Sequence, residues 1–209
     1  MLERIILAEP RGFCAGVEVA IDTVRRVAEK FPGEPIYMVH QIVHNQYVVR
    51  DLQDNYNTVF VKDISEVPNG ARIVLSAHGS PTRVYEEAKR RKMRINDATC
   101  DLVSLVHKKA RRCSNLGYEV VLIGHKGHQE VIGTMGQIEG IHLVETPLDV
   151  ETLEIDRAAR VAGITQTTLS LYDVDSVVKA LERRYVNFVM PKDNICFATT
   201  NRQEAVEAM

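Results

Sequence analysis

The chain has 209 residues, of which 45% are hydrophobic and 26% charged, and its 26 basic and 28 acidic side chains give a formal charge of -2. This balance is typical of a globular protein with one large or two modest domains, and it excludes the overall basic face that would indicate a nucleic-acid partner. No apolar run approaches the roughly 18 residues that span a bilayer, and residues 1–10 lack a secretory-signal pattern, so we expect a cytoplasmic protein with no membrane partner.

Short runs rich in isoleucine and valine alternate with helix-like stretches along the whole chain. The strand pattern predicts strands over residues 4–9, 35–43, 58–62, 72–77, 94–98, 119–124, 141–145, 160–165 and 187–190. The helical pattern predicts helices over residues 17–31, 45–54, 80–92, 102–117, 128–138 and 171–185. This alternation predicts an α/β fold whose sheets are mainly parallel and covered by helices on both faces. In such sheets, ligands bind at the carboxyl ends of the strands.

Three of the four cysteines share one context. Cys14, Cys100 and Cys196 each follow a strand-like segment and open a helix-like one, at separations of 86 and 96 residues. This pattern indicates one structural unit used three times, each unit presenting a thiol at a strand-to-helix junction. Cys113 differs, because it shares an apolar helix face with Val103 and Ala110, and we expect it in the core.

A cysteine in the first turn of a helix is favoured as the thiolate, the form that binds metals. Three such thiolates suit either a zinc ion with a histidine as fourth ligand or an iron–sulfur cluster with one iron left open. Widely separated single cysteines favour the cluster, since structural zinc sites usually use close C-x-x-C pairs and the chain has none. Three unrelated buried cysteines are the remaining interpretation.

Histidines repeat the strand-end pattern. His44, His78 and the pair His125 and His128 each follow a predicted strand, and the hydroxyl-rich residues 165–170 follow another. Small polar loops of this kind bind phosphate well, whereas the chain has no P-loop motif for nucleotide hydrolysis. Glu130 lies two residues after His128. A closed site would raise the pKa of its carboxyl and allow proton delivery, but spacing alone favours a solvated first-turn glutamate.

Seven motifs, in order along the chain, resemble those of the 4-hydroxy-3-methylbut-2-enyl diphosphate reductases: PRGFCAGV, VHNQYVV, SAHGSP, DATCDLV, GHKGHQEVIGTMGQ, TQTTLS and ICFATTNRQEAV. The resemblance runs from about Arg4 to the last residues. It implies repeated similar α/β domains in a trefoil-like arrangement around a central site, and a reaction in the methylerythritol phosphate pathway of isoprenoid biosynthesis.

The resemblance also implies a cofactor and roles for particular residues. A 4Fe-4S cluster is implied, held by Cys14, Cys100 and Cys196, and electrons come from a donor such as ferredoxin or flavodoxin. The small-molecule substrate is an allylic diphosphate. Its implied contacts are His44, His78, His128, Thr167 and Thr168, with Glu130 and Thr167 as the implied catalytic residues.

The sequence departs from the family in two respects. Gln129 and Ile132 replace a proline and a glutamate, and Asp101 replaces the proline after the second cysteine. Only 13 residues follow Cys196, so we expect an incomplete third domain. The predicted domains are residues 14–96, residues 97–190, and a remnant made of residues 1–13 and 191–209. Because the third domain is short, turnover by this chain is in question. A non-catalytic cluster- or diphosphate-binding remnant and a zinc-dependent α/β hydrolase remain as alternatives.

Overall fold

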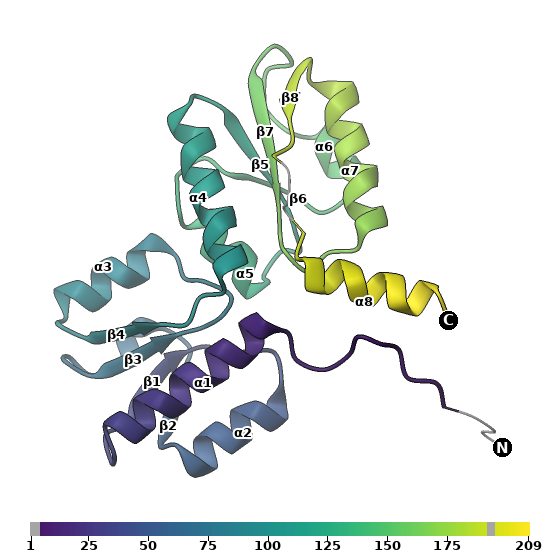
Figure 1. Cartoon of the computed structure of the whole chain (residues 1–209). Coiled ribbons are helices and arrows are strands. Elements are labelled where there is room, and N and C mark those ends of the chain that lie inside the picture. Colours follow the sequence, from purple (N-terminus) through teal and green to yellow (C-terminus); the bar gives the residue numbers. More distant parts are fainter. Residues whose placement is uncertain (1–4, 192–194) are drawn as a thin grey trace.

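The computed structural model describes residues 5–191 and 195–209 and contains two four-stranded sheets with the same strand order (Figure 1). The first sheet has the order β2-β1-β3-β4 and the second has the order β6-β5-β7-β8, and every described strand pair is parallel. The predicted α/β class with mainly parallel sheets is therefore confirmed. We call α1 to β4 the first unit and α4 to β8 the second unit. The domain boundaries given above stay predictions.

The first unit alternates strands and helices in chain order: α1 (Ala15–Lys30), β1 (Ile36–Val39), α2 (Gln46–Asn55), β2 (Thr58–Val61), the short 3-10 helix η1 (Ile64–Glu66), β3 (Arg72–Leu75), α3 (Thr82–Arg90) and β4 (Arg94–Asp97). Its sheet is buried on both faces. Val74 of β3 packs with α1 and α2 on one face, whereas Ile73 and Leu75 pack with α3 on the other, because successive side chains of a strand point to opposite sides.

The second unit repeats this plan with α4 (Asp101–Asn115), β5 (Glu119–Ile123), α5 (Gln129–Met135), β6 (His142–Val144), α6 (Pro147–Glu151), β7 (Arg160–Thr165), α7 (Leu171–Arg184) and β8 (Asn187–Val189). Along β5, Val121 and Ile123 pack with α7, while Val120 and Leu122 pack with α4. Cys113 packs against this second core, as expected from its helix face.

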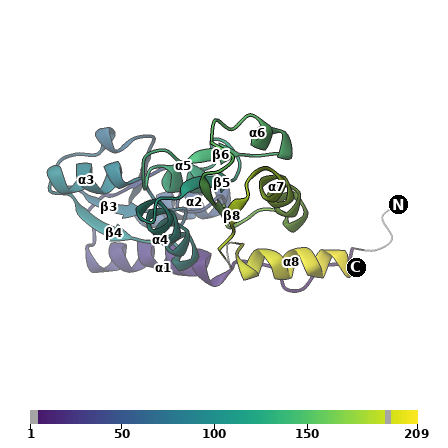
Figure 2. The ribbon, with the colours of Figure 1, turned by 90° about the horizontal axis from the view of Figure 1, so that it is seen from above.

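The last helix, α8 (Phe197–Glu207), lies outside both sheets, and the N-terminal segment runs along the same side of the molecule (Figures 1 and 2). Arg202 of α8 donates a hydrogen bond to the carbonyl oxygen of Gly12, with an N···O distance of 3.1 Å. No strand among the described residues accompanies α8. The N-terminal segment and α8 therefore adjoin the two α/β units, and the incomplete third domain stays a prediction.

Two sequence expectations need correction. The strand predicted over residues 4–9 is wrong for Ile5–Glu9, which form no strand; Arg4 lies outside the described residues. Ile5 is 78% exposed, and a strand requires a neighbour for its backbone groups, which this segment lacks among the described strands. The helix α6 was not predicted, although Thr146, Pro147 and Asp149 form the N-terminal capping pattern that signals it.

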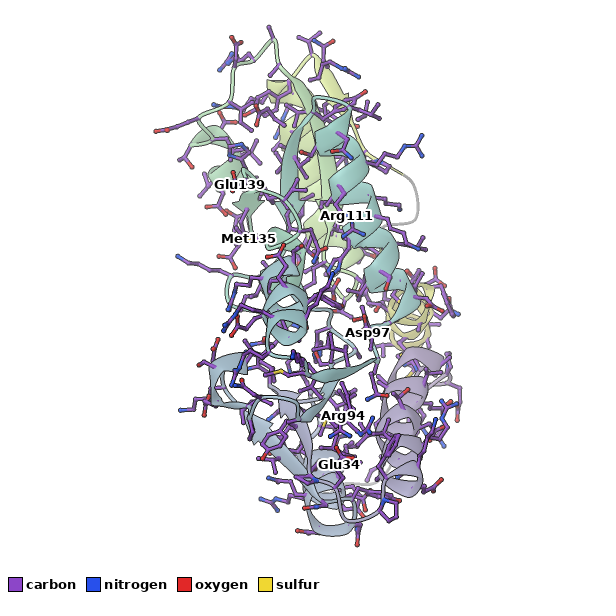
Figure 3. The ribbon with its side chains drawn as sticks, turned by 90° about the vertical axis from the view of Figure 1, so that its left-hand side faces the viewer. Glu34, Arg94, Asp97, Arg111, Met135 and Glu139 are labelled. Carbon is purple, nitrogen blue, oxygen red and sulfur yellow. The ribbon has the colours of Figure 1, made fainter. Side chains whose placement is uncertain are left out.

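The outer end of the first unit is fixed by a buried ion pair. Arg72 is 6% exposed, pairs with Glu34 at 3.3 Å and stacks on the ring of Phe31. Arg94 of β4 also pairs with Glu34, and Figure 3 shows these two residues together. The cluster ties the end of α1 to β3 and β4.

No helix among residues 5–191 and 195–209 is long and apolar enough to cross a membrane.

Candidate functional site

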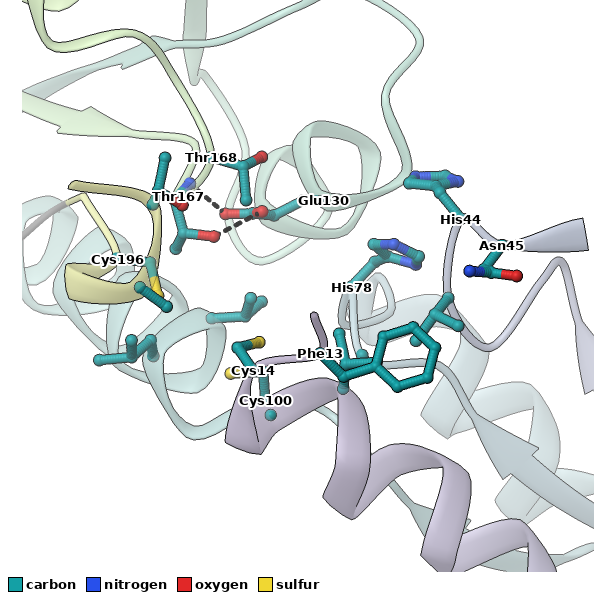
Figure 4. A pocket seen from close by; sticks show the side chains of 18 of the residues that line it. Phe13, Cys14, His44, Asn45, His78, Cys100, Glu130, Thr167, Thr168 and Cys196 are labelled. Carbon is teal, nitrogen blue, oxygen red and sulfur yellow. Dashed lines mark hydrogen bonds between the residues drawn. The ribbon is translucent and has the colours of Figure 1, made fainter. Parts of the chain in front are cut away.

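One pocket collects the ends of strands from both units. Its cavity of about 340 Å³ lies where loops leave β1, β3, β4 and β7 and meet the N-terminal ends of α1, α4 and α8 (Figure 4). Eight of the nine residues predicted for the site line it: Cys14, His44, His78, Cys100, Glu130, Thr167, Thr168 and Cys196. The ninth, His128, adjoins it, with its ring centroid 5.1 Å from that of His44.

The three predicted thiols occupy the same position in three helices. Cys14, Cys100 and Cys196 are the N-cap residues of α1, α4 and α8. Their sulfur atoms point toward a common region of the pocket (Figure 4). The pKa of the Cys100 thiol is raised, mainly by burial and further by the neighbouring Cys196 and Cys14, because three negative charges in one place repel each other. A cationic centre between the sulfurs would relieve this repulsion.

A glycine makes room for two of the sulfurs. A Cβ atom placed on Gly16 would lie 2.7 Å from Cys100 Sγ and 3.9 Å from Cys14 Sγ, so both sulfurs lie within 4 Å of a single point. Within the described part of the chain, no three His, Cys, Asp or Glu side chains are grouped as ligands of one metal ion. A polynuclear centre bridges wider gaps between cysteine ligands than a single zinc ion does.

Three histidine rings form a cluster beside the thiols. The centroid of His78 lies 4.2 Å from that of His44 and 5.8 Å from that of His128, so both units contribute. Burial, reinforced by His44 and His128, lowers the pKa of His78 to about 3, and burial also lowers the pKa of His128. Both rings are therefore neutral at pH 7. The Nδ1 atom of His128 accepts the backbone N–H of Glu130 at 3.1 Å, so the proton of the neutral ring is on Nε2.

Glu130 is the most deeply buried ionisable group of the pocket. Glu130 is only 2% exposed, so the expectation of a solvated first-turn glutamate was wrong. The carboxylate accepts the backbone N–H of Thr167 at 2.7 Å and its Oγ1 hydroxyl at 2.9 Å. Burial raises the pKa of Glu130 to about 7, and the two hydrogen bonds from Thr167 only partly oppose this shift. The group can therefore hold or release a proton near neutral pH.

Other residues complete the pocket or lie outside it. Asn45 and Arg202 also line the cavity, although neither was predicted as a site residue. Asn45 directly follows His44 and Arg202 lies in the last of the seven motifs, so the motifs could have indicated both residues. His125 is outside the cluster, with a largely exposed side chain 3.9 Å from Glu145. Ile132, which replaces the family's glutamate, is 40% exposed on α5 and does not line this cavity.

The fold and the site define an α/β protein in which thiols from three helix starts, a histidine cluster and a buried carboxyl group surround one pocket. The LytB protein family matches residues 5–209, and the chain belongs to this family.

The similar proteins are named for one enzymatic activity. A protein of Azoarcus sp. (strain BH72) named 4-hydroxy-3-methylbut-2-enyl diphosphate reductase is 52% identical over 207 residues, which cover 98% of this chain and 66% of the relative. The reductase of Enterobacter sp. (strain 638) is 50% identical, with 99% and 66% covered. The solved structure of the E-1-hydroxy-2-methyl-but-2-enyl-4-diphosphate reductase from Plasmodium falciparum superposes with a TM-score of 0.91 at 39% identity, and the match covers 96% of this chain and 63% of that chain. The chain thus spans just under two thirds of the length of these relatives.

Proposed function

We propose that this chain catalyses the reaction for which its relatives are named: it removes the hydroxyl group of 4-hydroxy-3-methylbut-2-enyl diphosphate reductively and gives isopentenyl and dimethylallyl diphosphates. The observation that carries the proposal is the convergence of three N-cap thiols, two histidines and a buried carboxyl group in one pocket, with a third histidine beside it. Family membership supports it. We place this step in the methylerythritol phosphate pathway of the cytoplasm.

The residues fit the cofactor that the family implies. Cys14, Cys100 and Cys196 would hold a 4Fe-4S cluster, since they converge on one pocket from three directions and Gly16 leaves space beside two of the sulfurs. When bound through only three cysteines, such a cluster supplies an iron with an open position and a route for electrons. We propose a ferredoxin or flavodoxin as the electron donor.

The histidine cluster suits the diphosphate. His44, His78 and His128 lie together, and the neutral ring of His128 presents an Nε2–H donor. A bound anion would favour protonation of these rings, because a nearby negative charge stabilises the imidazolium. The rings would then bind phosphate oxygens through charge-assisted hydrogen bonds and orient the other end of the substrate toward the thiols.

Glu130 and Thr167 are suited to move a proton. The overall change consumes two electrons and two protons: the C–O bond breaks, one proton leaves with the hydroxyl as water, and the other forms the new C–H bond. With a pKa of about 7, the Glu130 carboxyl holds a proton in about half of the molecules at neutral pH. Its hydrogen bond with Thr167 Oγ1 connects that proton to a hydroxyl that lines the pocket.

Anaerobic reconstitution with iron and sulfide tests the proposal. We expect the brown visible absorption of a cluster, its loss in Cys14→Ser, Cys100→Ser or Cys196→Ser, and its retention in the matched control Cys113→Ser, whose thiol packs in the second core. With a reduced viologen dye, the loaded chain should turn over the hydroxylated diphosphate.

Each alternative gives a different result. A loaded cluster with no turnover would overturn the catalytic proposal and leave a binding remnant. Stoichiometric zinc without iron uptake would favour the hydrolase. A full visible spectrum in Cys196→Ser would remove that residue from the ligand set.

A further inference from the structure

The loop that carries His78 is held from two sides by the second unit. Residues 76–81 connect β3 to α3 in the first unit, and Ser76 and Ser80 are 6% and 8% exposed. The backbone of Gly79 has a φ of +76°, a conformation that favours glycine. A buried polar loop in this conformation requires partners, and they come from α5 and α4.

On one side, α5 and its C-cap residue each present a glycine to the loop. A Cβ atom on Gly133 would lie 2.8 Å from the carbonyl oxygen of Gly79, and one on Gly136 would lie 2.3 Å from Pro81 Cβ. Positions three apart share one face of a helix, so this face of α5 is flat enough for the loop backbone to pack directly on it. The contact with Gly79 is to a backbone atom, which cannot move aside as the end of a flexible side chain can.

Hydrogen bonds connect the same surfaces. The side-chain amide of Gln137 donates to the carbonyl oxygens of Ser80 at 2.9 Å and Gly133 at 2.8 Å, so one group spans the boundary between the units. The backbone N–H of Thr82 donates to the carbonyl oxygen of Gly136 at 2.9 Å. Arg111 of α4, labelled in Figure 3, donates to the Gln137 side-chain oxygen and holds the amide in this orientation.

On the other side, His107 of α4 fills the space beside Gly79. A Cβ atom on Gly79 would lie 2.5 Å from His107 Cε1 and 3.0 Å from Val103 Cγ1. His107 is 6% exposed, and its Nε2 atom has no hydrogen-bond partner among the described residues. Burial lowers the pKa of His107 to about 4, so the ring is neutral and packs as a spacer.

We propose that Gly133, Gly136, Gln137 and His107 are positioning residues that fix the 76–81 loop and so hold His78 against His44 and His128. The helix that packs on the loop begins next to His128 and contains Glu130, so α5 sets the relation between the histidines of the two units. The expected effect on diphosphate binding rests on the proposed function. The expected effect on the conformation of the 76–81 loop does not rest on it.

Two variants and two matched controls test this. Gly133→Ala places a methyl group against the loop backbone, and Gln137→Met removes the hydrogen bonds at similar side-chain length. Gly163→Ala in β7 is the control for the first, because the atoms nearest its Cβ would be side-chain atoms, Met190 Sδ at 2.7 Å and the Phe188 ring at 3.0 Å, and not loop backbone. Gln53→Met is the control for the second, at an exposed position of α2.

Three measurements distinguish positioning from a general loss of stability. In both test variants we expect faster amide hydrogen exchange in the 76–84 segment, and an NMR titration of His78 that moves from a pKa of about 3 toward its ordinary 6.5 as the ring gains solvent. Inorganic pyrophosphate should bind roughly tenfold more weakly, the effect of losing about one well-placed hydrogen bond. The controls should leave all three values unchanged.

The outcomes separate this inference from the proposed function. Unchanged hydrogen exchange and an unchanged His78 titration in folded Gln137→Met would overturn the proposed positioning role, even if Gly133→Ala fails to fold. Failure of the wild-type chain to bind pyrophosphate would count against the proposed function. Hydrogen exchange and the His78 titration would still decide whether these residues position the 76–81 loop.

Discussion

Glu130 shows how a single buried side chain can couple the pocket to the stability of the whole protein. Its carboxyl group lies in a nearly dry environment, where it accepts two hydrogen bonds from Thr167. An unfolded chain would expose this carboxyl to water and restore its ordinary pKa. The folded protein therefore binds a proton that the unfolded chain releases between about pH 4.5 and pH 7.

This difference predicts an effect of Glu130→Gln on the pH dependence of unfolding. Because the folded-state pKa is raised, the stabilising contribution is complete below about pH 4.5 and is lost as the pH rises through about 7. Relative to the Gln variant, the wild type should lose about 3 kcal/mol of unfolding free energy between pH 4 and pH 8, since each pKa unit corresponds to about 1.4 kcal/mol. Urea unfolding of both proteins at several pH values measures this difference in unfolding free energy.

The comparison has a built-in control. The lowered pKa values of His78 and His128 act in the opposite direction, but both proteins contain these residues and their contribution cancels in the difference. Glu18→Gln, at an exposed position in the first turn of α1, should give a curve parallel to that of the wild type. Parallel curves for Glu130→Gln would show that the carboxyl is not held in its buried, protonated form.

At the scale of elements, the three helix starts that carry thiols were predictable and their surroundings were not. Cys14, Cys100 and Cys196 each stand where strand-like residues give way to a helical pattern, which is a local signal, and all three are N-caps. The burial of Glu130 depends on Thr167, 37 residues away along the chain. Contacts of this kind arise from packing between elements, and local periodicity carries no information about them.

The start of α1 predicts the effect of Gly16→Ala. Replacing a helical glycine with alanine ordinarily favours the helix, so the variant should fold with similar or higher stability. The added methyl group would displace Cys100 Sγ, which lies 2.7 Å from its position. We expect roughly tenfold weaker iron binding, as for other changes next to metal ligands. Iron and sulfide analysis after reconstitution measures it, with Val19→Ala on the exposed face of α1 as control. Full iron loading together with normal stability would contradict the expected crowding.

At the scale of the whole molecule, the repeated unit was predictable because strands and helices alternate with the same order in both halves. The packing of α5 and α4 against the 76–81 loop was not predictable, because nothing local distinguishes Gly133 and Gly136 from other glycines until the facing loop is placed against them. The strand expected near the N-terminus failed for a related reason: an apolar run such as Ile5 to Leu7 indicates a strand only if another strand lies beside it.

The N-terminal segment and α8 run along the same side of the molecule (Figure 2), and both carry exposed apolar side chains. Ile5, Leu7, Phe197 and Val206 are each more than 60% exposed. Apolar clusters of this kind bind hydrophobic dyes and promote association. The folded chain should enhance the fluorescence of anilinonaphthalene sulfonate, and Phe197→Ser with Val206→Ser should reduce it by about half. Tyr47→Ser removes a separate aromatic ring that is even more exposed, and it should not change the signal; an equal loss in this control would mean that the dye does not report on α8.

The placement of the three thiols also has a consequence for biosynthesis. Cys14 lies near the start of the sequence, and Cys196 follows only after most of it. A nascent chain emerging from the ribosome therefore cannot present the complete trio until Cys196 has been translated. On the proposed function, iron and sulfide could be assembled on all three ligands only after residue 196 has been translated, and a chain that awaits them would have to keep neighbouring thiols reduced.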